Sequence, residues 1–213
     1  MSHLDYHSAQ FSENLAIGIL HSCGVSCELN NIEDKTAVDI CTNTGVKIDV
    51  QFSNNFARYG DFRLDIVSVY TPKNAVADRT YIFDSNLNII KNFEQKYHCN
   101  VSKVGKILQK NYLDYFIILF YNEKFLEQDP DYMLLISKSD LVAYIKPNVG
   151  HFFHRIIINN KQVNFNEIGL QDEHGSAFIP IKVSDLVQCT NCIFGAPDEF
   201  ISRGQQVRTY LGL

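Results

Sequence analysis

Apolar and polar residues alternate between Ala37 and Gln51, and this pattern predicts two short strands joined by a tight turn. The turn falls at Asn43–Gly45, where the glycine can adopt a positive φ angle. A three-residue loop centred on Thr44 sets the register of this hairpin, because it places Thr42 opposite Val46. The alternating apolar positions are Val38, Ile40, Val46, Ile48 and Val50. We therefore predict a β-hairpin at this point in the chain.

The same periodicity predicts helices and strands along the rest of the chain. Phe11, Leu15 and Ile19 recur at four-residue intervals and predict a first helix over 8–23, which Gly24 ends. The nearly continuous apolar run over 114–121 predicts a strand buried on both faces. The other predicted helices are one capped by Asp84 or Ser85, one over 102–110, one that starts at Ser137 and ends at Pro147, and one starting at Pro197. The other predicted strands cover 25–29, 62–70, 81–83, 133–136, 177–181 and 183–187, with a second hairpin over 152–165.

These elements predict a mixed α/β fold in which helices flank a central mixed sheet. The strand over 62–70 is expected to continue the first hairpin as the third strand of an antiparallel meander. With 213 residues, of which 46% are hydrophobic, the chain is expected to form a single domain over 1–213. Within that domain, 1–121 would form the main core, and 122–213 would form a strand-rich part packed on it.

The register of the first hairpin also places Asp39 opposite Asp49, and Gln51 projects from the same face as Asp49. Directly opposed residues have Cβ atoms about 5 Å apart. At that distance two carboxylates repel each other by about 0.8 kcal/mol in water and by about 3 kcal/mol at an effective dielectric constant of 20. In a central hairpin the pair therefore predicts a divalent cation between the carboxylates. In an exposed hairpin the same acids are simply solvated.

This arrangement resembles the active site of the restriction-endonuclease-like, or PD-(D/E)XK, nuclease superfamily. In that superfamily a first acid and an acid-x-Lys triplet on the next strand hold one or two magnesium ions, and an upstream helix often supplies another acid. Asp39 matches the first acid, Asp49 and Gln51 match the ends of the triplet, and Glu13 matches the helix acid. The resemblance covers roughly 8–121. It implies a restriction-endonuclease-like core and a magnesium-dependent nuclease, with manganese as a second ion, acting on DNA in preference to RNA.

The chain departs from the superfamily pattern at two positions. No proline precedes Asp39, and Gln51 stands where the superfamily usually has lysine, although some members also carry glutamine. The resemblance implies that Asp39, Asp49 and Glu13 bind the metal while Gln51 orients the attacking water. For Glu13, a first-turn acid favoured by the helix dipole is an equal alternative. The alternative function is a nuclease-fold protein with little or no activity that binds nucleic acid or protein, as an inhibitory or anti-defence module.

The formal net charge of −5 gives no overall basic signature for nucleic-acid binding. Contacts to a phosphate backbone would then come from local basic residues. Arg58 and Arg63 lie in and just after an asparagine-rich loop, and Lys103, Lys106 and Lys110 form a basic stripe on the predicted helix over 102–110. The alternative for all five is an ordinary solvated surface, and for Arg63 an ion pair with Asp65 on the same face of its strand is a further alternative.

Six cysteines in this length are too sparse for a disulfide scaffold. Cys189 and Cys192 form a CxxC motif that could hold zinc together with Cys23 and Cys27, but core or incidental cysteines are the favoured alternative. No apolar run reaches about 18 residues and the N-terminus lacks a signal-peptide core, so a soluble, cytoplasmic protein is expected. The richness in Asn, Ile, Lys and Tyr suggests a phage or mobile-element source, and the resemblance adds a homodimer as a further expectation.

Overall fold

The computed structural model describes residues 3–30, 38–54, 56–72, 89–97, 99–109, 112–122, 128–152, 157–158, 161–162 and 175–213. The chain divides into two compact units. Unit 1 consists of Met1–Asp61, Tyr112–Leu141 and Lys182–Leu213, and unit 2 consists of Phe62–Asn111 and Val142–Ile181. Each unit is assembled from segments distant in the sequence, so the division does not fall at residue 121. Each unit has its own sheet, and the predicted mixed α/β class is confirmed.

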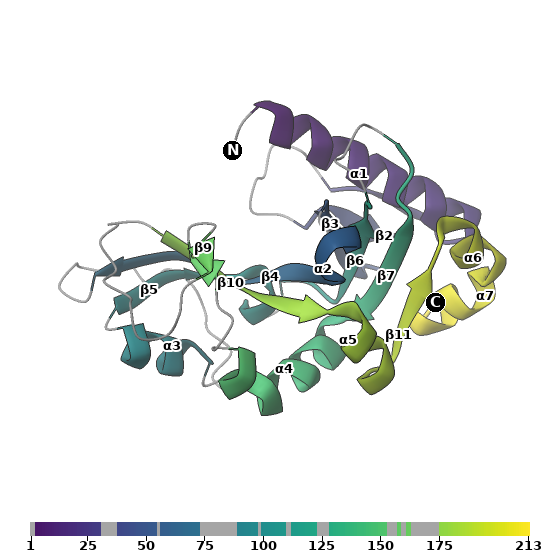
Figure 1. Cartoon of the computed structure of the whole chain (residues 1–213). Coiled ribbons are helices and arrows are strands. Elements are labelled where there is room, and N and C mark those ends of the chain that lie inside the picture. The colour runs from purple at the N-terminus through teal and green to yellow at the C-terminus, as the bar shows by residue number, and fades with distance from the viewer. Residues whose placement is uncertain are drawn as a thin grey trace. The chain divides into compact units, whose positions relative to one another are not determined.

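Unit 1 is built on a six-stranded sheet with the strand order β1-β2-β3-β6-β7-β11 (Figure 1). Neighbouring strands are antiparallel except β3 and β6, which are parallel, so the sheet is mixed, as predicted. The strands are β1 (Cys27–Leu29), β2 (Ile40–Thr42), β3 (Lys47–Ser53), β6 (Tyr115–Phe120), β7 (Tyr132–Ser137) and β11 (Cys192–Gly195). The helices that belong to this unit alone are α1 (His3–Ser22), α2 (Phe56–Tyr59), α5 (Val183–Cys189), α6 (Pro197–Ser202) and α7 (Gly204–Tyr210).

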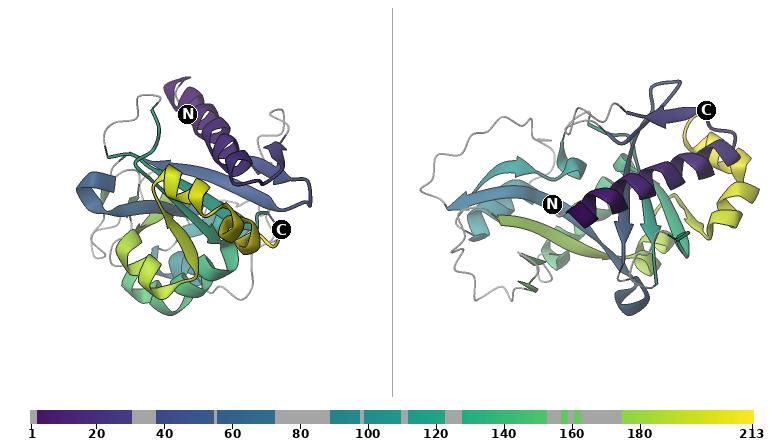
Figure 2. Two further views of the ribbon diagram at one scale, coloured as in Figure 1. Left: turned by 90° about the vertical axis from the view of Figure 1, so that its right-hand side faces the viewer. Right: turned by 90° about the horizontal axis from the view of Figure 1, so that it is seen from above.

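The helices α1, α6 and α7 cover one face of this sheet, and the view from above shows α1 running across the strands (Figure 2). Their apolar side chains form one buried cluster with Ile48 of β3 and Ile117 of β6. Because successive strand residues point to opposite faces, Asp49 and Phe116 point to the other face, which we call the second face. The ring of Phe56 in α2 lies on the second face, since its centroid is 4.6 Å from that of Phe120.

The predicted hairpin is confirmed in position and register. Ile40 of β2 pairs with Ile48 of β3, which is the pairing that a loop centred on Thr44 requires. The backbone N–H of Thr42 donates to the carbonyl of Val46 at 2.9 Å, and Gly45 has a φ angle of +87°. The turn glycine and the alternation of apolar residues therefore determine the register together.

The first helix is also confirmed, although α1 begins earlier than predicted. Gly24 ends it with a φ angle of +78°. The N–H of Gly24 donates to His21 O at 2.8 Å, and the N–H of Val25 donates to Leu20 O at 2.9 Å. These two bonds define a Schellman motif, and the apolar contact that accompanies it is present because Leu20 and Val25 belong to the same buried cluster.

The strands predicted over 114–121 and 133–136 are confirmed as β6 and β7. Every side chain from Phe116 to Phe120 is buried, as expected for a central strand. Ser137 caps the following helix, α4 (Lys138–Phe152), because its Oγ accepts the N–H of Asp140 at 3.0 Å. The predicted end of this helix at Pro147 is wrong, since α4 continues through it. The carbonyl that the proline leaves without a helical donor belongs to Ala143, whose exposed position allows water to replace that donor.

Unit 2 contains a five-stranded sheet with the order β5-β4-β10-β8-β9. The strands are β4 (Asp61–Pro72), β5 (Cys99–Val104), β8 (Ile157–Ile158), β9 (Lys161–Gln162) and β10 (Gly175–Lys182), and α3 (Ile89–Tyr97) precedes β5. The pairing of Ile158 with Lys161 confirms the second hairpin, and α3 confirms part of the helix expected after Ser85. The strand predicted over 81–83 lies outside the described residues.

The predicted meander is wrong, because β4 belongs to the sheet of unit 2 and does not pair with β3. The place beside β3 is taken by β6, a strand that is buried on both faces. The chain leaves β3 through the short helix α2, and Gly60 then turns it with a φ angle of +63°. A buried apolar strand gains more from a central position than the half-polar strand over 62–70 would.

Two further predicted elements have the wrong type. In place of the helix predicted over 102–110, the described residues 102–109 contain the end of β5 and a 3₁₀ turn, η1 (Lys106–Leu108), because Gly105 lies against the β4 backbone and donates its N–H to Ile66 O at 3.1 Å. Residues 183–187 form the start of α5, where Val183 and Leu186 are the buried pair, at helical spacing. The helix start at Pro197 is confirmed by α6. The part of the chain from residue 183 onward is therefore mostly helical.

Candidate functional site

The two predicted acids are neighbours across the hairpin formed by β2 and β3 in unit 1. Asp39 immediately precedes β2, and its Oδ2 accepts the backbone N–H of Val50 at 2.7 Å. Asp49 lies on β3 with a side chain that is 0% exposed, and its Oδ2 accepts the amide Nε2 of Gln51 at 3.2 Å. The next residue pair beyond Ile40 and Ile48 in the register is Asp39 and Asp49. The structure therefore brings Asp39, Asp49 and Gln51 together around one strand.

Glu13 lies on α1, which covers the face of the sheet that carries Ile48. Asp49 and Gln51 alternate with Ile48 and point to the second face. The structure therefore does not bring Glu13 beside Asp49. The alternative interpretation of Glu13 as a first-turn acid is also wrong, because α1 begins at His3 and Glu13 lies in the middle of the helix.

The donor set around β3 fits a hard divalent cation with oxygen ligands. Magnesium is usually bound through one or two carboxylates, with water and substrate phosphates completing its coordination, and Asp39 and Asp49 supply two carboxylates. Within the described ranges, no group of three or more His, Cys, Asp or Glu side chains is arranged to hold a metal ion. A site at this position would therefore take its remaining ligands from water and substrate.

The four cysteines considered for zinc are all described, and they do not gather into such a group. Cys23 donates its thiol to the carbonyl of Phe200 at 3.4 Å. Burial raises the pKa of the Cys27 thiol to about 11, which disfavours the thiolate that a zinc ion requires. Cys189 is exposed on α5, and Cys192 lies on β11.

The predicted cations are divided between the two units. Arg58 belongs to unit 1, where its guanidinium carbon lies 5.0 Å from the centre of the Tyr59 ring. Arg63 belongs to unit 2 and lies 4.6 Å over the Phe178 ring. Lys103 is on β5 and Lys106 begins η1, so the predicted helical stripe of lysines does not exist. Lys110 lies outside the described residues.

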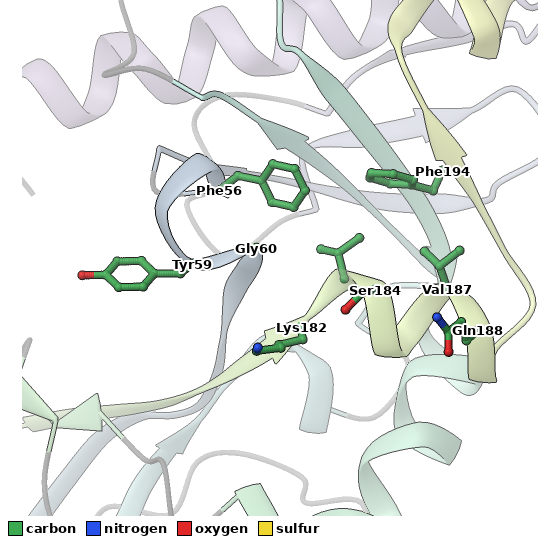
Figure 3. Close-up of a pocket in the computed structure, with 9 residues that line it drawn as sticks. Phe56, Tyr59, Gly60, Lys182, Ser184, Val187, Gln188 and Phe194 are labelled. Atoms are coloured by element: carbon green, nitrogen blue, oxygen red, sulfur yellow. The ribbon is translucent and has the colours of Figure 1, made fainter.

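A pocket of about 420 Å³ opens on unit 1 at a place that no predicted site residue except Arg58 adjoins (Figure 3). Phe56 and Phe194 point toward one another along one side of it, and Lys182 lies on another side. The remaining described lining residues are Tyr59, Gly60, Val183, Ser184, Val187 and Gln188. The only sequence signal for this pocket is the Phe-Ala-Arg-Tyr segment after the asparagine-rich loop, because the contributions of β11 and α5 depend on the fold.

A second, more polar pocket of about 580 Å³ lies near the C-terminal helix of unit 1. Its centre is the hydroxyl of Tyr210, which accepts the N–H of Ser137 at 3.0 Å and lies 2.7 Å from Asn191 O and 3.2 Å from Asp140 Oδ2. Burial is the main cause that raises the pKa of Tyr210 to about 12. The hydroxyl of Tyr115 donates to Tyr210 O at 2.8 Å. This network ties α7 to the junction of β7 and α4, and its bonds are those of a structural link.

No protein-family model matches the chain, and neither the curated proteins nor the solved structures contain a significant match. Among the helices that the structure describes, none has the length and apolarity needed to cross a membrane. The functional argument therefore depends on the residues of the sites themselves.

Proposed function

We propose that this protein is a metal-dependent nuclease that hydrolyses phosphodiester bonds, with DNA as its substrate. The observation that carries the proposal is the fully buried carboxylate of Asp49, with Asp39 as its neighbour in the register and the Gln51 amide bonded to it. Burying a carboxylate costs several kcal/mol unless other groups compensate for the lost water. An ionisable side chain buried on a central strand beside a second acid is a candidate for function.

The strand order around the acids supports the same proposal. A helix, three antiparallel strands and a fourth strand parallel to the third follow one another as α1, β1, β2, β3 and β6. Asp39 immediately precedes the second strand, and Asp49 lies within the third. This is the placement that the resemblance to restriction-endonuclease-like nucleases implies for the first acid and for the acid-x-Lys triplet.

In this proposal Asp39 and Asp49 hold the cation, which when bound polarises the phosphate and lowers the pKa of a water molecule. The residues of the chain have separate tasks. The bond from Asp39 to Val50 N–H and the bond from Gln51 to Asp49 fix the orientation of both carboxylates. Gln51 orients the attacking water by hydrogen bonding and does not remove its proton, because an amide is neutral at all relevant pH values. Arg58 and Arg63 are proposed to contact phosphates.

The test is cleavage of single-stranded and double-stranded DNA with Mg²⁺ or Mn²⁺, comparing the wild type with Asp39→Asn and Asp49→Asn. Both changes keep a hydrogen-bond acceptor and remove the charge. We expect each to lower the cleavage rate by about 100-fold or more. The matched control is Asp114→Asn, because Asp114 Oδ2 also accepts a β3 backbone N–H, that of Lys47 at 2.9 Å. Cleavage should survive in this control.

Equal cleavage by the wild type and Asp49→Asn would refute the proposal. Absence of cleavage with every substrate and ion, in a protein that remains folded, would favour the alternative of a nuclease-fold binding protein without activity. A thermal-shift titration separates these cases further. Binding of the ion at 100 times its dissociation constant stabilises the fold by about 2.7 kcal/mol, and Asp49→Asn should remove this stabilisation.

A further inference from the structure

The aromatic pocket of unit 1 lies on the same face of the sheet as Asp49. Phe116 of β6 pairs with Asp49, and Phe120, four residues further along the strand, points to the same face. The Phe56 ring packs on Phe120. Residue Ser53, at the end of β3, is about 13 Å along the strand from Asp49. A nucleic-acid strand with one base held in the pocket would therefore reach the acids a few nucleotides further along.

Two rings of this pocket, those of Phe56 and Phe194, are packed against other aromatic rings. The Tyr132 ring stacks on the Phe194 ring with a centroid distance of 5.5 Å and an interplanar angle of 18°. Phe56 lies 5.8 Å from Tyr132 and 6.4 Å from Phe194, measured between ring centroids. A ring that is already packed against a neighbour loses little conformational entropy when a flat ligand stacks on it. The cluster therefore offers preorganised aromatic surface at the edge of a cavity.

The charges and polar groups around the pocket indicate which flat ligand it would take. Among the described lining residues, Lys182 is the charged one, and it is exposed. Arg58 is outside the described lining, but its guanidinium lies over the ring of Tyr59, which lines the pocket, so it supplies a second cation beside that residue. Ser184 and Gln188 add hydrogen-bonding groups on the α5 side. Aromatic surface beside cations and amide groups suits a base with an attached phosphate better than it suits a purely apolar ligand.

We propose that this pocket binds an unpaired base of a single-stranded nucleic acid. The inference rests on the proposed nuclease function and specifies its substrate class as single strands or duplexes with unpaired ends. Stacking on Phe194 and Phe56 holds the base, and Lys182 and Arg58 hold the flanking phosphates. The pocket thereby sets the path of the strand across the second face toward Asp49.

The test measures binding without cleavage, by fluorescence anisotropy of a labelled single-stranded oligonucleotide in chelator, with the Asp49→Asn protein as parent. Phe194→Leu keeps an apolar side chain and removes the aromatic face, and we expect it to weaken binding by about 5- to 100-fold. Lys182→Ala should weaken binding and reduce the slope of log affinity against log salt by about 0.7. The matched controls are Phe52→Leu, on the opposite face of β3, and Lys47→Ala, an exposed lysine of the same strand. Both should bind as the parent does.

The proposal would be overturned by unchanged binding of Phe194→Leu and Phe56→Leu, by equal affinity for a strand without bases, or by equal competition from a free mononucleotide. A blunt duplex that binds as tightly as the single strand would overturn it as well. Because the binding assay is done in chelator, without metal ions, its result stands even if the nuclease proposal is refuted. Conversely, cleavage could depend on Asp49 while Phe194→Leu binds the oligonucleotide as tightly as the parent does. That result would refute the pocket assignment alone. Circular dichroism of each variant shows whether the fold is retained.

Discussion

Replacing Tyr210 by phenylalanine tests whether the polar network at the C-terminal helix holds unit 1 together. The change removes one hydroxyl and leaves the ring contact with Tyr115, at 5.6 Å between centroids, in place. The hydroxyl has one proton and donates either to Asn191 O or to Asp140, while it accepts the N–H of Ser137. A lost hydrogen bond costs about 0.5–1.5 kcal/mol, and a buried N–H left without this acceptor costs about 1–3 kcal/mol. We therefore expect Tyr210→Phe to lower the free energy of unfolding by about 2–4 kcal/mol.

The assay is equilibrium unfolding in urea, followed by far-ultraviolet circular dichroism. The control is Tyr59→Phe, because the Tyr59 side chain is 45% exposed and its hydroxyl should contribute less than about 0.5 kcal/mol. A loss in Tyr210→Phe no larger than that of the control would refute the reasoning. It would mean that water replaces the Tyr210 hydroxyl as acceptor for Ser137 at no cost.

The same hydroxyl predicts a pH dependence. Burial is the largest cause that raises the pKa of Tyr210 to about 12, whereas an exposed tyrosine in the unfolded chain ionises near 10. Between about pH 10 and pH 12 the unfolded chain loses this proton and the folded chain keeps it. The contribution of the protonated form is therefore complete below pH 10, and stability falls as the pH rises to 12. Tyr210→Phe should lose less stability across this window than the wild type, although Tyr121, with a pKa raised to about 12, contributes in both proteins.

Three substitutions test the local structure. Gly24→Ala places a Cβ at a φ angle of +78° and 2.7 Å from Arg208 Nη1, so we expect a loss of about 1–2 kcal/mol in urea unfolding, and an unchanged midpoint would contradict the Schellman assignment. Gly105→Ala places a Cβ in collision with the backbone carbonyl oxygen of Asp65, so a loss of about 3 kcal/mol is expected, with faster hydrogen exchange in β4 and β5 as the measurement. Ser137→Ala removes the cap of α4 and should cost about 1 kcal/mol, measured as faster exchange in the first turn of that helix; unchanged exchange would show that the cap contributes nothing.

The elements that could be predicted from the sequence are those determined by residues close together in the chain. The hairpin register follows from Gly45 and the alternation beside it, and the end of α1 follows from Gly24. The strand β6 follows from an apolar run too continuous for a solvated face. The register of Asp39 with Asp49 belongs to the same group, because it requires only the length of the loop between them.

The failures concern choices that depend on distant partners. The alternation of residues over 62–70 predicts a strand, but it does not determine which sheet that strand joins. The parallel pairing of β3 with β6 joins residues about 67 apart in the sequence. The run over 102–110 has apolar residues at spacings that fit either a helix or a strand followed by a turn. The contact between Gly105 and the β4 backbone selects the second form. The aromatic pocket depends on α2, which is distant in sequence from the other two contributing elements, α5 and β11.

The two acids of the hairpin differ in how much of their presence the fold itself explains. Asp39 bonds a backbone N–H of β3 from the β2 side, and Asp114 does the same from the β6 side, so an acid in that position has a structural use. Asp49 is fully buried on β3, where its side chain points to the second face and accepts the Gln51 amide. Aspartate is among the residues least often fully buried, so its presence on a central strand indicates function more strongly than that of Asp39. We expect an apolar residue at position 49 to preserve the sheet and to abolish the activity.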